Sequence, residues 1–204
     1  MRVGVLASGA GTNLQAILDR LHGRRGIEVV AVASDQPGAP ALQRAAAAGV
    51  PMGEFPLADY ADRARRDEAT ADFLADHGVE LVVLAGYMAL LEPEFLARFP
   101  QRIINVHPAL LPAFPGVRAI EQALDYGVKV GGVTVHFVDE GVDTGPVLLQ
   151  EAFDLPYHRD IAEIEDRVHQ IEHRLLPQAV RLIAQGRVTV DPDNPRLVHV
   201  DVAD

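Results

Sequence analysis

Short apolar runs alternate with amphipathic segments along the first hundred residues. The runs are nearly continuous in apolar residues and are bounded by glycine, proline or polar residues, which is typical of strands buried on both faces. Between them apolar positions recur at helical spacing, as in Leu14, Ile17, Leu18 and Leu21. The expected strands cover 2–7, 27–33, 52–55 and 81–85, and the expected helices begin near Thr12 and cover 41–48 and 60–77. This repetition predicts an α/β, Rossmann-like fold with a mostly parallel central sheet and helices on both faces.

The pattern changes after Ile104. The segment NVHPALLPAFPGV, residues 105–117, is rich in proline and predicts an ordered loop rather than a helix. Apolar runs at 133–138 and 147–153, separated by DEGVDTGP, predict an antiparallel pair. We further expect helices over 118–125 and 160–185, and two short strands after Gly186. The chain is expected to be a single domain, 1–204, with a nucleotide-binding-like lobe over 1–100 and a second lobe over 101–204.

Composition narrows the class of protein. There are 18 basic and 29 acidic residues, and the net charge of -11 makes a nucleic acid or an anionic membrane an unfavourable partner. An anionic ligand would need a local site made of backbone N–H groups or a few basic side chains. The absence of cysteine excludes disulfides, thiolate nucleophiles and cysteine-bound metals. The chain has no expected signal peptide or membrane span, which favours the cytoplasm.

A glycine-rich turn, SGAGTN at residues 8–13, follows the first expected strand. The N–H groups at such a strand-to-helix junction favour an anion. The dinucleotide fingerprint would need glycine where Leu14 stands, and the Walker lysine is missing. A plain tight turn therefore stays open, as does a nicotinamide-dependent dehydrogenase that binds ribose through Asp35, or a nucleotide-binding module without catalysis.

Asn105, His107 and Asp143 form the second candidate site, on loops expected beyond the carboxyl ends of strands. An asparagine amide can donate to a developing oxyanion, an imidazole can donate or carry a proton, and a carboxylate can orient that imidazole and raise its pKa. The alternative is a satisfied loop histidine and a turn-forming aspartate. A metal site that adds His136 has no compact ligand spacing to support it, so no metal is expected.

The expected C-terminal helix contains a polar stripe. Residues three or four apart share one face of a helix, and the stripe consists of His169, Glu172, His173 and Leu176. Most such stripes are ordinary helix surface.

Several segments together resemble the glycinamide ribonucleotide formyltransferase family. They are GVLASGAGTNLQAI, VVLAGYMALL, IINVHPALLPAFPG, TVHFVDEGVDTGPVLLQ and RVHQIEHRLLP, and they extend from residue 4 to residue 177. The combination of NVHP, LLP and PG with D-x-G-P is highly specific. The resemblance implies transfer of a formyl group from 10-formyltetrahydrofolate, as co-substrate and without a metal, to the amine of glycinamide ribonucleotide in purine biosynthesis.

The resemblance also assigns residues. It implies a catalytic trio of Asn105, His107 and Asp143. The glycinamide ribonucleotide would be held by Gly11, Thr12, Asn13, His169 and Glu172. The folate would be framed by Arg63, Met88, Ala89, Leu90, Leu91, Asn105, Asp139 and Asp143. Partners would be small molecules; a homodimer is compatible with the sequence, which does not itself report the oligomeric state.

Two positions depart from the family, in which many members carry a basic residue in place of Ala89 and a serine in place of Ala109. Two related enzymes remain as alternatives. Methionyl-tRNA formyltransferase would add a tRNA-binding domain and show an arginine–glycine pair where Pro115 and Gly116 stand. Formyltetrahydrofolate hydrolase would use water as acceptor and usually has a further N-terminal domain.

Overall fold

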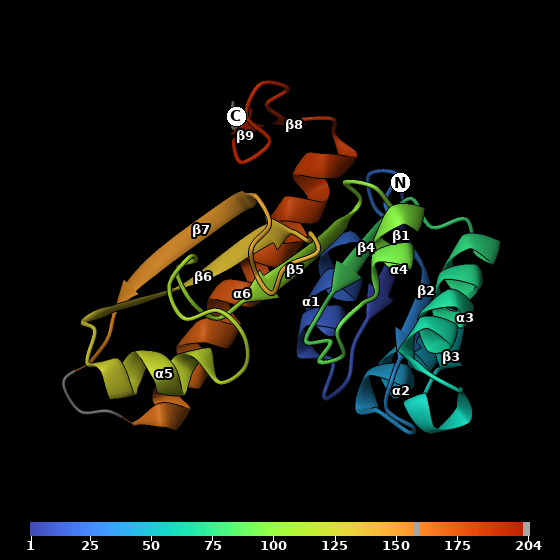
Figure 1. Cartoon of the computed structure of the whole chain (residues 1–204), viewed down its shortest axis with the longest axis horizontal. Helices are drawn as coiled ribbons and strands as arrows, with labels where there is room; N and C mark the ends of the chain where they lie inside the picture. The colour runs from blue at the N-terminus through green and yellow to red at the C-terminus, as the bar shows by residue number, and fades with distance from the viewer. Residues whose placement is uncertain (157–159, 202–204) are drawn as a thin grey trace. The chain divides into compact units, whose positions relative to one another are not determined.

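The computed structural model describes residues 1–156 and 160–201 and has an α/β fold (Figure 1). Its strands form a seven-stranded sheet in the order β3-β2-β1-β4-β5-β6-β7 and a two-stranded sheet, β8-β9. The expected mostly parallel sheet with an antiparallel C-terminal portion is confirmed. The backbone groups into two compact units, residues 1–105 and 106–204. No helix within the described residues is long and apolar enough to cross a bilayer.

The first unit is a parallel sheet with helices on both faces. The strand order places β2 and β3 on one side of β1, and β4 and β5 on the other. Accordingly α1 contacts α2, and α3 contacts α4. The strands are β1 (Arg2–Leu6), β2 (Glu28–Ser34), β3 (Met52–Glu54), β4 (Leu81–Leu84) and β5 (Ile103–His107); the helices are α1 (Thr12–Leu21), α2 (Pro40–Ala47), α3 (Arg63–Asp76) and α4 (Pro93–Arg98), with a 3-10 turn η1 (Leu57–Asp59).

The core of the first unit explains its continuous apolar strands. Every residue of β4 is buried, as is all of β1 after Arg2. A parallel strand covered on both faces needs apolar side chains at successive positions, not at alternate ones. The carboxyl ends of these strands therefore become the edge at which polar side chains can gather.

The second unit is built on an antiparallel pair. β6 (Val130–Phe137) pairs with β7 (Val147–Asp154), and α6 (Ile161–Ala184) contacts both strands. Asp160 caps α6, since its Oδ1 accepts the N–H of Ala162 at 3.0 Å. Helix α5 (Ala119–Tyr126) contacts α6, and the two short strands after Gly186 are present as β8 (Val188–Val190) and β9 (Val198–Val200).

Some expected boundaries were wrong. Asn105 and His107 lie on β5 and not on a loop, because Pro108 restricts His107 to extended backbone and the strand continues up to the proline. Helix α3 begins later than Tyr60, because Asp62 caps it by accepting the N–H of Arg65 at 2.9 Å. Helix α4 was not expected, since a helix of 6 residues is too short to show a helical period.

Candidate active site

Strand β5 presents two of the expected catalytic residues. Alternate residues of a strand point to the same face of the sheet, so Asn105 and His107 share a face. Asn105 is half-buried and pairs in register with Leu84 of β4, while His107 is buried at 4% exposure. The end of the strand therefore presents an amide and an imidazole on the same face of the sheet.

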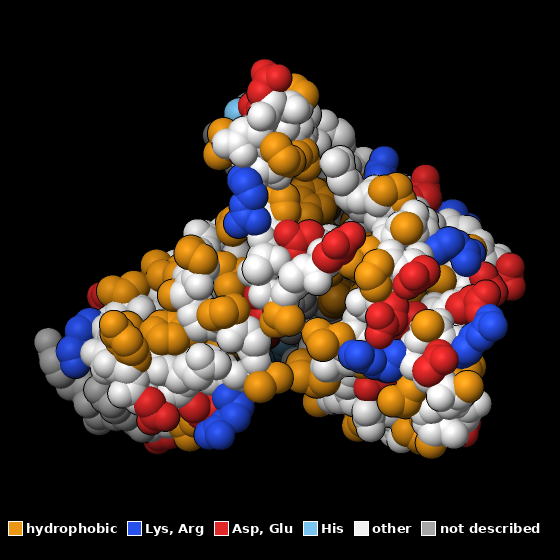
Figure 2. Space-filling view, viewed as in Figure 1, with side chains coloured by type: hydrophobic (Ala, Val, Ile, Leu, Met, Phe, Trp, Pro, Cys, Tyr) orange, Lys and Arg blue, Asp and Glu red, His pale blue; other side chains and the backbone are white. Residues whose placement is uncertain are grey.

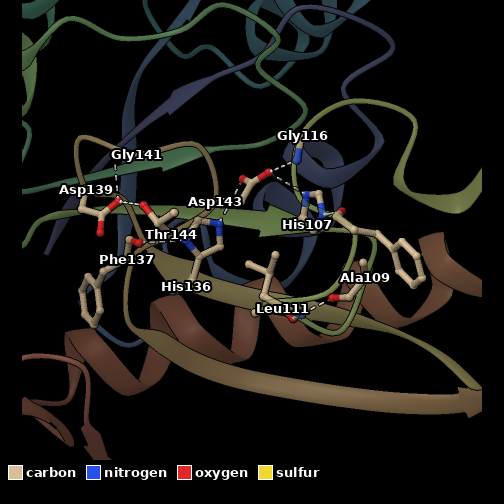
Figure 3. Close-up of polar contacts among 12 residues, drawn as sticks. His107, Ala109, Leu111, Gly116, His136, Phe137, Asp139, Gly141, Asp143 and Thr144 are labelled. Atoms are coloured by element: carbon tan, nitrogen blue, oxygen red, sulfur yellow. Dashed lines mark hydrogen bonds and ion pairs between the residues drawn. The ribbon is translucent and has the colours of Figure 1, made fainter. Parts of the chain in front are cut away.

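Both ring nitrogens of His107 face acceptors. Nε2 lies 2.8 Å from the carbonyl oxygen of Phe114, and Nδ1 lies 3.3 Å from Oδ2 of Asp143 (Figure 3). A carbonyl oxygen only accepts, so Nε2 carries a proton in either charge state of the ring. Nδ1 then carries one only when the ring is an imidazolium. The geometry thus suits a histidine that gains and loses a second proton at Nδ1, beside the Asp143 carboxylate.

The carboxylate of Asp143 lies between two imidazoles (Figure 3). Its Oδ2 also accepts the N–H of Gly116 at 2.7 Å, and its Oδ1 lies 3.5 Å from Nε2 of His136. Burial raises the pKa of Asp143, but the hydrogen bonds from His136 and Gly116 and the two imidazoles outweigh burial and hold that pKa below its usual value of 3.8. Asp143 is therefore ionised across the neutral range.

The pKa of His107 is lowered overall, although the neighbouring Asp143 carboxylate raises it as expected. Burial lowers this pKa below the ordinary 6.5, and the imidazole of His136 lowers it further. Asp143 and the carbonyl of Phe114 act in the opposite direction without reversing the result. His107 is thus mainly neutral at pH 7 in the structure as it stands.

The loop from β6 to β7 is held in one conformation by its own contacts. The Oδ1 of Asp139 accepts the hydroxyl of Thr144 at 2.6 Å and the N–H of Gly141 at 3.1 Å. A side chain at Gly145 would place its Cβ 1.8 Å from the carbonyl oxygen of Phe137, so only glycine fits there. Asp143 takes the left-handed backbone conformation, φ 53°, that aspartate tolerates better than most residues. This close-fitting loop aims the Asp143 carboxylate at His107.

The proline-rich segment after His107 is tied to β6. The hydroxyl of Thr134 donates to the carbonyl of Ala109 at 2.6 Å and accepts the N–H of Leu111 at 3.1 Å. Ala109 is buried and contributes through its backbone, so a serine hydroxyl is not required for this contact. Gly116 and Phe114, which hold Asp143 and His107, both come from this same segment.

The glycine-rich turn lies in the first unit at the start of α1. Gly11 has φ 70°, and a Cβ there would lie 2.7 Å from the Cα of Ala41, so the approach of α2 requires glycine. Arg44 fixes the turn by donating to the carbonyl of Ala10 at 2.8 Å. Asn13 is buried and Thr12 half-buried, whereas Gly9 and Ala10 are exposed.

The expected folate residues of the first unit lie on or near the segment after β4. Met88 is 68% exposed and Leu90 56%, while Ala89 and Leu91 are half-buried. The N–H of Met88 donates to the hydroxyl of Ser8 at 2.8 Å, which links this segment to the glycine-rich turn. Arg63, the first residue of α3, pairs with Glu92 at 3.2 Å.

A buried ion pair that the sequence analysis did not single out supports this segment. Arg66 and Asp67 are at most 3% exposed and their side chains lie 2.6 Å apart. Arg66 donates to the carbonyl of Leu90 at 3.0 Å, and Asp67 accepts the N–H of Glu92 at 2.7 Å. Because Arg66 and Asp67 are adjacent charged residues on a polar helix, the sequence pattern did not predict that they are buried. In the fold they fix the backbone of residues 90–92.

Asp67→Asn should lower the free energy of unfolding by about 3 kcal/mol, because it leaves the Arg66 guanidinium buried without its counter-ion. It should also raise the KM for the folate without changing the KM for the formyl acceptor. Thermal melts and steady-state kinetics measure the two effects. Glu68→Gln is the matched control, since Glu68 is exposed and pairs with exposed Arg65, and it should change neither value. Equal folate KM values in the Asp67→Asn and wild-type proteins would contradict the role of the Arg66–Asp67 pair.

The polar stripe of α6 lies in the second unit. Glu172 and Leu176 are buried, His173 is half-buried and His169 is exposed. The rings of His169 and His173 stack with centroids 6.1 Å apart. The buried carboxylate of Glu172 is unusual for a helix surface and separates this stripe from ordinary solvated positions.

His136 does not complete a metal site. In the part of the chain that the structure describes, no three His, Asp or Glu side chains form a group that could hold a metal ion. The Nδ1 of His136 is instead 2.8 Å from the carbonyl of Phe137, and only Nε2 faces Asp143. The three side chains of this cluster are thus arranged as hydrogen-bond partners and not as ligands around one point.

Known proteins resemble the chain over both units. Residues 1–180 match the family model of the formyl transferases. The chain is 46% identical over 189 residues to the phosphoribosylglycinamide formyltransferase of Mycobacterium tuberculosis, which covers 93% of this chain and 87% of that protein. It is 40% identical to the trifunctional purine biosynthetic protein adenosine-3 of Chironomus tentans, over 93% of this chain but only 14% of that protein.

Comparison with solved structures gives the same result. The crystal structure of glycinamide ribonucleotide transformylase 1 from Symbiobacterium toebii matches with a TM-score of 0.93 and 47% identity, covering 98% of this chain and 93% of that one. The sequence match and the structural match agree on one family. The chain belongs to the formyl transferase family.

Proposed function

We propose that this protein transfers the formyl group of 10-formyltetrahydrofolate to the amine of glycinamide ribonucleotide in de novo purine biosynthesis. The products are formylglycinamide ribonucleotide and tetrahydrofolate. The observation that carries the proposal is the contact of His107 with Asp143, since both stand in the motifs that resemble this enzyme family. The names of the similar proteins agree with the reaction.

The first step needs an oxyanion site and no covalent bond to the protein. The neutral amine attacks the formyl carbon, its lone pair forms the new C–N bond, and the carbonyl π electrons move to the formyl oxygen. A fixed donor beside that oxygen stabilises the transition state, and loss of one donor typically costs about 3 kcal/mol. Asn105 supplies such a donor from the face of β5 that it shares with His107, and an imidazolium at His107 would stabilise the same negative charge through its own positive charge.

His107 acquires its second proton during turnover. Burial keeps the ring neutral beforehand, but negative charge on the formyl oxygen favours the imidazolium and raises the pKa of His107 as the intermediate forms. The attacking amine must lose a proton, and Asp143, directly or through water, passes it to Nδ1 of His107, which later gives the same proton to N10 of the folate. The bond from the formyl carbon to N10 then breaks as the C=O bond reforms, and tetrahydrofolate leaves.

The family resemblance also suggests which residues bind the two substrates. We assign Gly11, Thr12 and Asn13 to the phosphoribosyl end of the acceptor, and His169 with Glu172 to its ribose and glycinamide portion. Arg63, Met88 to Leu91, and Asp139 with Asp143 would frame the folate. Orientation of two substrates can lower a barrier by about 7 to 11 kcal/mol, so these contacts matter as much as the trio.

Titration of the enzyme's own groups should lower the rate only below pH 6.5. The resting state that accepts the amine proton has a neutral His107 and an ionised Asp143, and the pKa of each lies below its ordinary value, 6.5 for the imidazole and 3.8 for the carboxyl. As the pH falls through the lowered pKa of His107, the ring becomes charged and activity is lost. The measurement is kcat/KM for the folate against pH, corrected for the fraction of acceptor amine that is neutral, since an α-amino group titrates at about pH 8. A corrected acid limb above pH 6.5 would contradict this assignment.

The function is tested by a panel of acceptors. Purified protein is mixed with 10-formyltetrahydrofolate and glycinamide ribonucleotide, methionyl-tRNA or buffer alone, and tetrahydrofolate release is followed. Release that depends on glycinamide ribonucleotide is the expected result. Release in buffer alone would identify a hydrolase, release that needs the charged tRNA would identify the other transferase, and no release would exclude formyl transfer.

We further propose that the enzyme acts in the cytoplasm on small molecules alone, with folate as co-substrate. On the face in Figure 2, acidic and basic side chains of the first unit are interspersed, which offers no continuous basic surface for nucleic acid there. A homodimer is compatible with this function, and sedimentation at the assay concentration tests it.

A further inference from the structure

Asp35 is a buried acidic residue that the proposed mechanism does not use. It directly follows β2, at the carboxyl edge of the parallel sheet, and it is 8% exposed. Its Oδ1 accepts the hydroxyl of Ser8 at 2.5 Å, and its Oδ2 accepts the side-chain amide of Gln36 at 2.8 Å. The sequence alone leaves Asp35 open as a carboxylate that binds a ribose. In the fold its two oxygens are engaged by side chains of the protein, so Asp35 is placed to hold Ser8 rather than to reach a ligand.

Ser8 connects the loops that follow three strands. It is the first residue of the glycine-rich turn after β1, and its hydroxyl meets Asp35 after β2. Its N–H donates to the carbonyl of Gly86 at 3.0 Å, and its Oγ accepts the N–H of Met88 at 2.8 Å. Two hydrogen bonds from one residue therefore hold the backbone of the segment that follows β4.

Asp35 determines the direction of the Ser8 hydroxyl. A hydroxyl has one proton to donate and two lone pairs that accept. Because the proton of Ser8 is donated to Asp35, only lone pairs are left to face the N–H of Met88. The orientation that suits the Met88 backbone is thus set by a side chain at the end of another strand.

Both segments that Ser8 joins are anchored in the first unit. On one side, the carbonyl of Ala10 accepts the guanidinium of Arg44 at 2.8 Å. On the other side, Tyr87 is buried, whereas the side chain of Met88 is exposed. The segment after β4 therefore keeps a fixed backbone while it presents the Met88 side chain to a ligand.

We infer that Ser8, oriented by Asp35, is a positioning residue that fixes the glycine-rich turn and the segment after β4 relative to each other. Binding of the ribonucleotide and binding of the folate then both depend on it. The inference rests on the proposed function, which assigns residues 11–13 to the phosphoribosyl end of the acceptor and residues 88–91 to the folate. The Arg66–Asp67 pair differs, because it holds residues 90–92 without a contact to the turn.

The test is Ser8→Ala, which removes both hydrogen bonds of the hydroxyl and leaves the backbone bond to Gly86. The KM values for glycinamide ribonucleotide and for 10-formyltetrahydrofolate should both rise about fivefold, as the loss of such hydrogen bonds predicts. The kcat should stay within about twofold, since the reacting groups are untouched. Ser8→Thr keeps the hydroxyl and should bring both KM values back to within about twofold of wild type. A change in only one KM value, no change in either, or an equal loss in the threonine variant would overturn the inference.

Thr70→Val is the matched control. Thr70 is also a buried hydroxyl of the first unit, but it donates within α3 to the carbonyl of Arg66 at 2.8 Å and joins no two segments. Both KM values should stay unchanged. If they rose as in Ser8→Ala, the effect would belong to any buried hydroxyl, and the assignment to Ser8 would be wrong.

Asp35→Asn separates a positioning role from contact with a ligand. The asparagine oxygen can still accept the Ser8 hydroxyl, and exposed Gln36 can turn its own amide oxygen toward the new NH2 group. Both KM values should therefore remain unchanged. A large rise in the ribonucleotide KM alone would place the Asp35 carboxylate against the ribose and would refute the inference.

Hydrogen exchange of the Met88 amide tests the contact without turnover. In the wild-type protein this N–H should exchange more slowly than in an unfolded chain, and in Ser8→Ala it should exchange at least about tenfold faster than in wild type. Exchange of the wild-type amide at the unfolded rate would overturn the inference even if Ser8→Ala does not fold. A protein that shows the protection but no acceptor-dependent formyl transfer would refute the proposed function and retain the contact.

Discussion

Asp143→Asn should lower kcat by at least about a hundredfold, equivalent to about 2.7 kcal/mol of transition-state stabilisation. The carboxylate only accepts hydrogen bonds, and it is met by the N–H of Gly116 and by imidazole nitrogens of His107 and His136. An asparagine amide carries no charge, so it cannot stabilise an imidazolium at His107 and cannot take up the amine proton.

The same variant should change the pH profile in a defined direction. Asp143 raises the pKa of His107, so its removal should move the acid limb of His107 to lower pH. The kcat and its pH dependence are measured on protein whose circular dichroism matches the wild type. Asp72→Asn is the matched control, since this carboxylate pairs with Arg98 on the surface at 3.0 Å. A folded Asp143→Asn protein with more than a tenth of the wild-type kcat would remove Asp143 from the mechanism.

Much of the fold could be predicted from the spacing at which apolar residues recur along the chain. The strands of the first unit are continuous in apolar residues because both faces are covered, and the long helix α6 buries a regular apolar stripe that includes Ile164, Val168, Ile171 and Leu175. These patterns are local, so they can be read along the chain. Helix α4 was not predicted, because six residues are too few to show a helical period. The end of β5 was predicted to be a loop, because the segment is rich in proline, although the backbone before Pro108 is extended.

The candidate site was predictable in its residue types and not in its electrostatics. Motif spacing placed His107 and Asp143 among the reactive residues, and the structure brings them within 3.3 Å. The lowered pKa of His107 depends on burial, which no residue in the motif specifies. The contact of His136 with Asp143 depends on a register shift between two strands, and the burial of Arg66 with Asp67 depends on the approach of residues 90–92. Such tertiary contacts leave no local pattern.

Asn105→Asp should lower kcat by at least about a thousandfold, more than Asn105→Ala, for which about a hundredfold is expected. Both changes remove the amide donor that β5 presents beside His107, but the aspartate also places negative charge where the formyl oxygen becomes negative. Comparing the steady-state kcat of the two variants separates the effect of the lost amide donor from the effect of the added negative charge. Asn194→Asp is the matched control, because the side-chain Oδ1 of Asn194 accepts the N–H of Arg196 at 3.1 Å and a carboxylate oxygen can do the same. If Asn105→Asp were as active as Asn105→Ala, the added charge would not be felt by the reacting oxygen, and the amide of Asn105 would have to face some other part of the substrates.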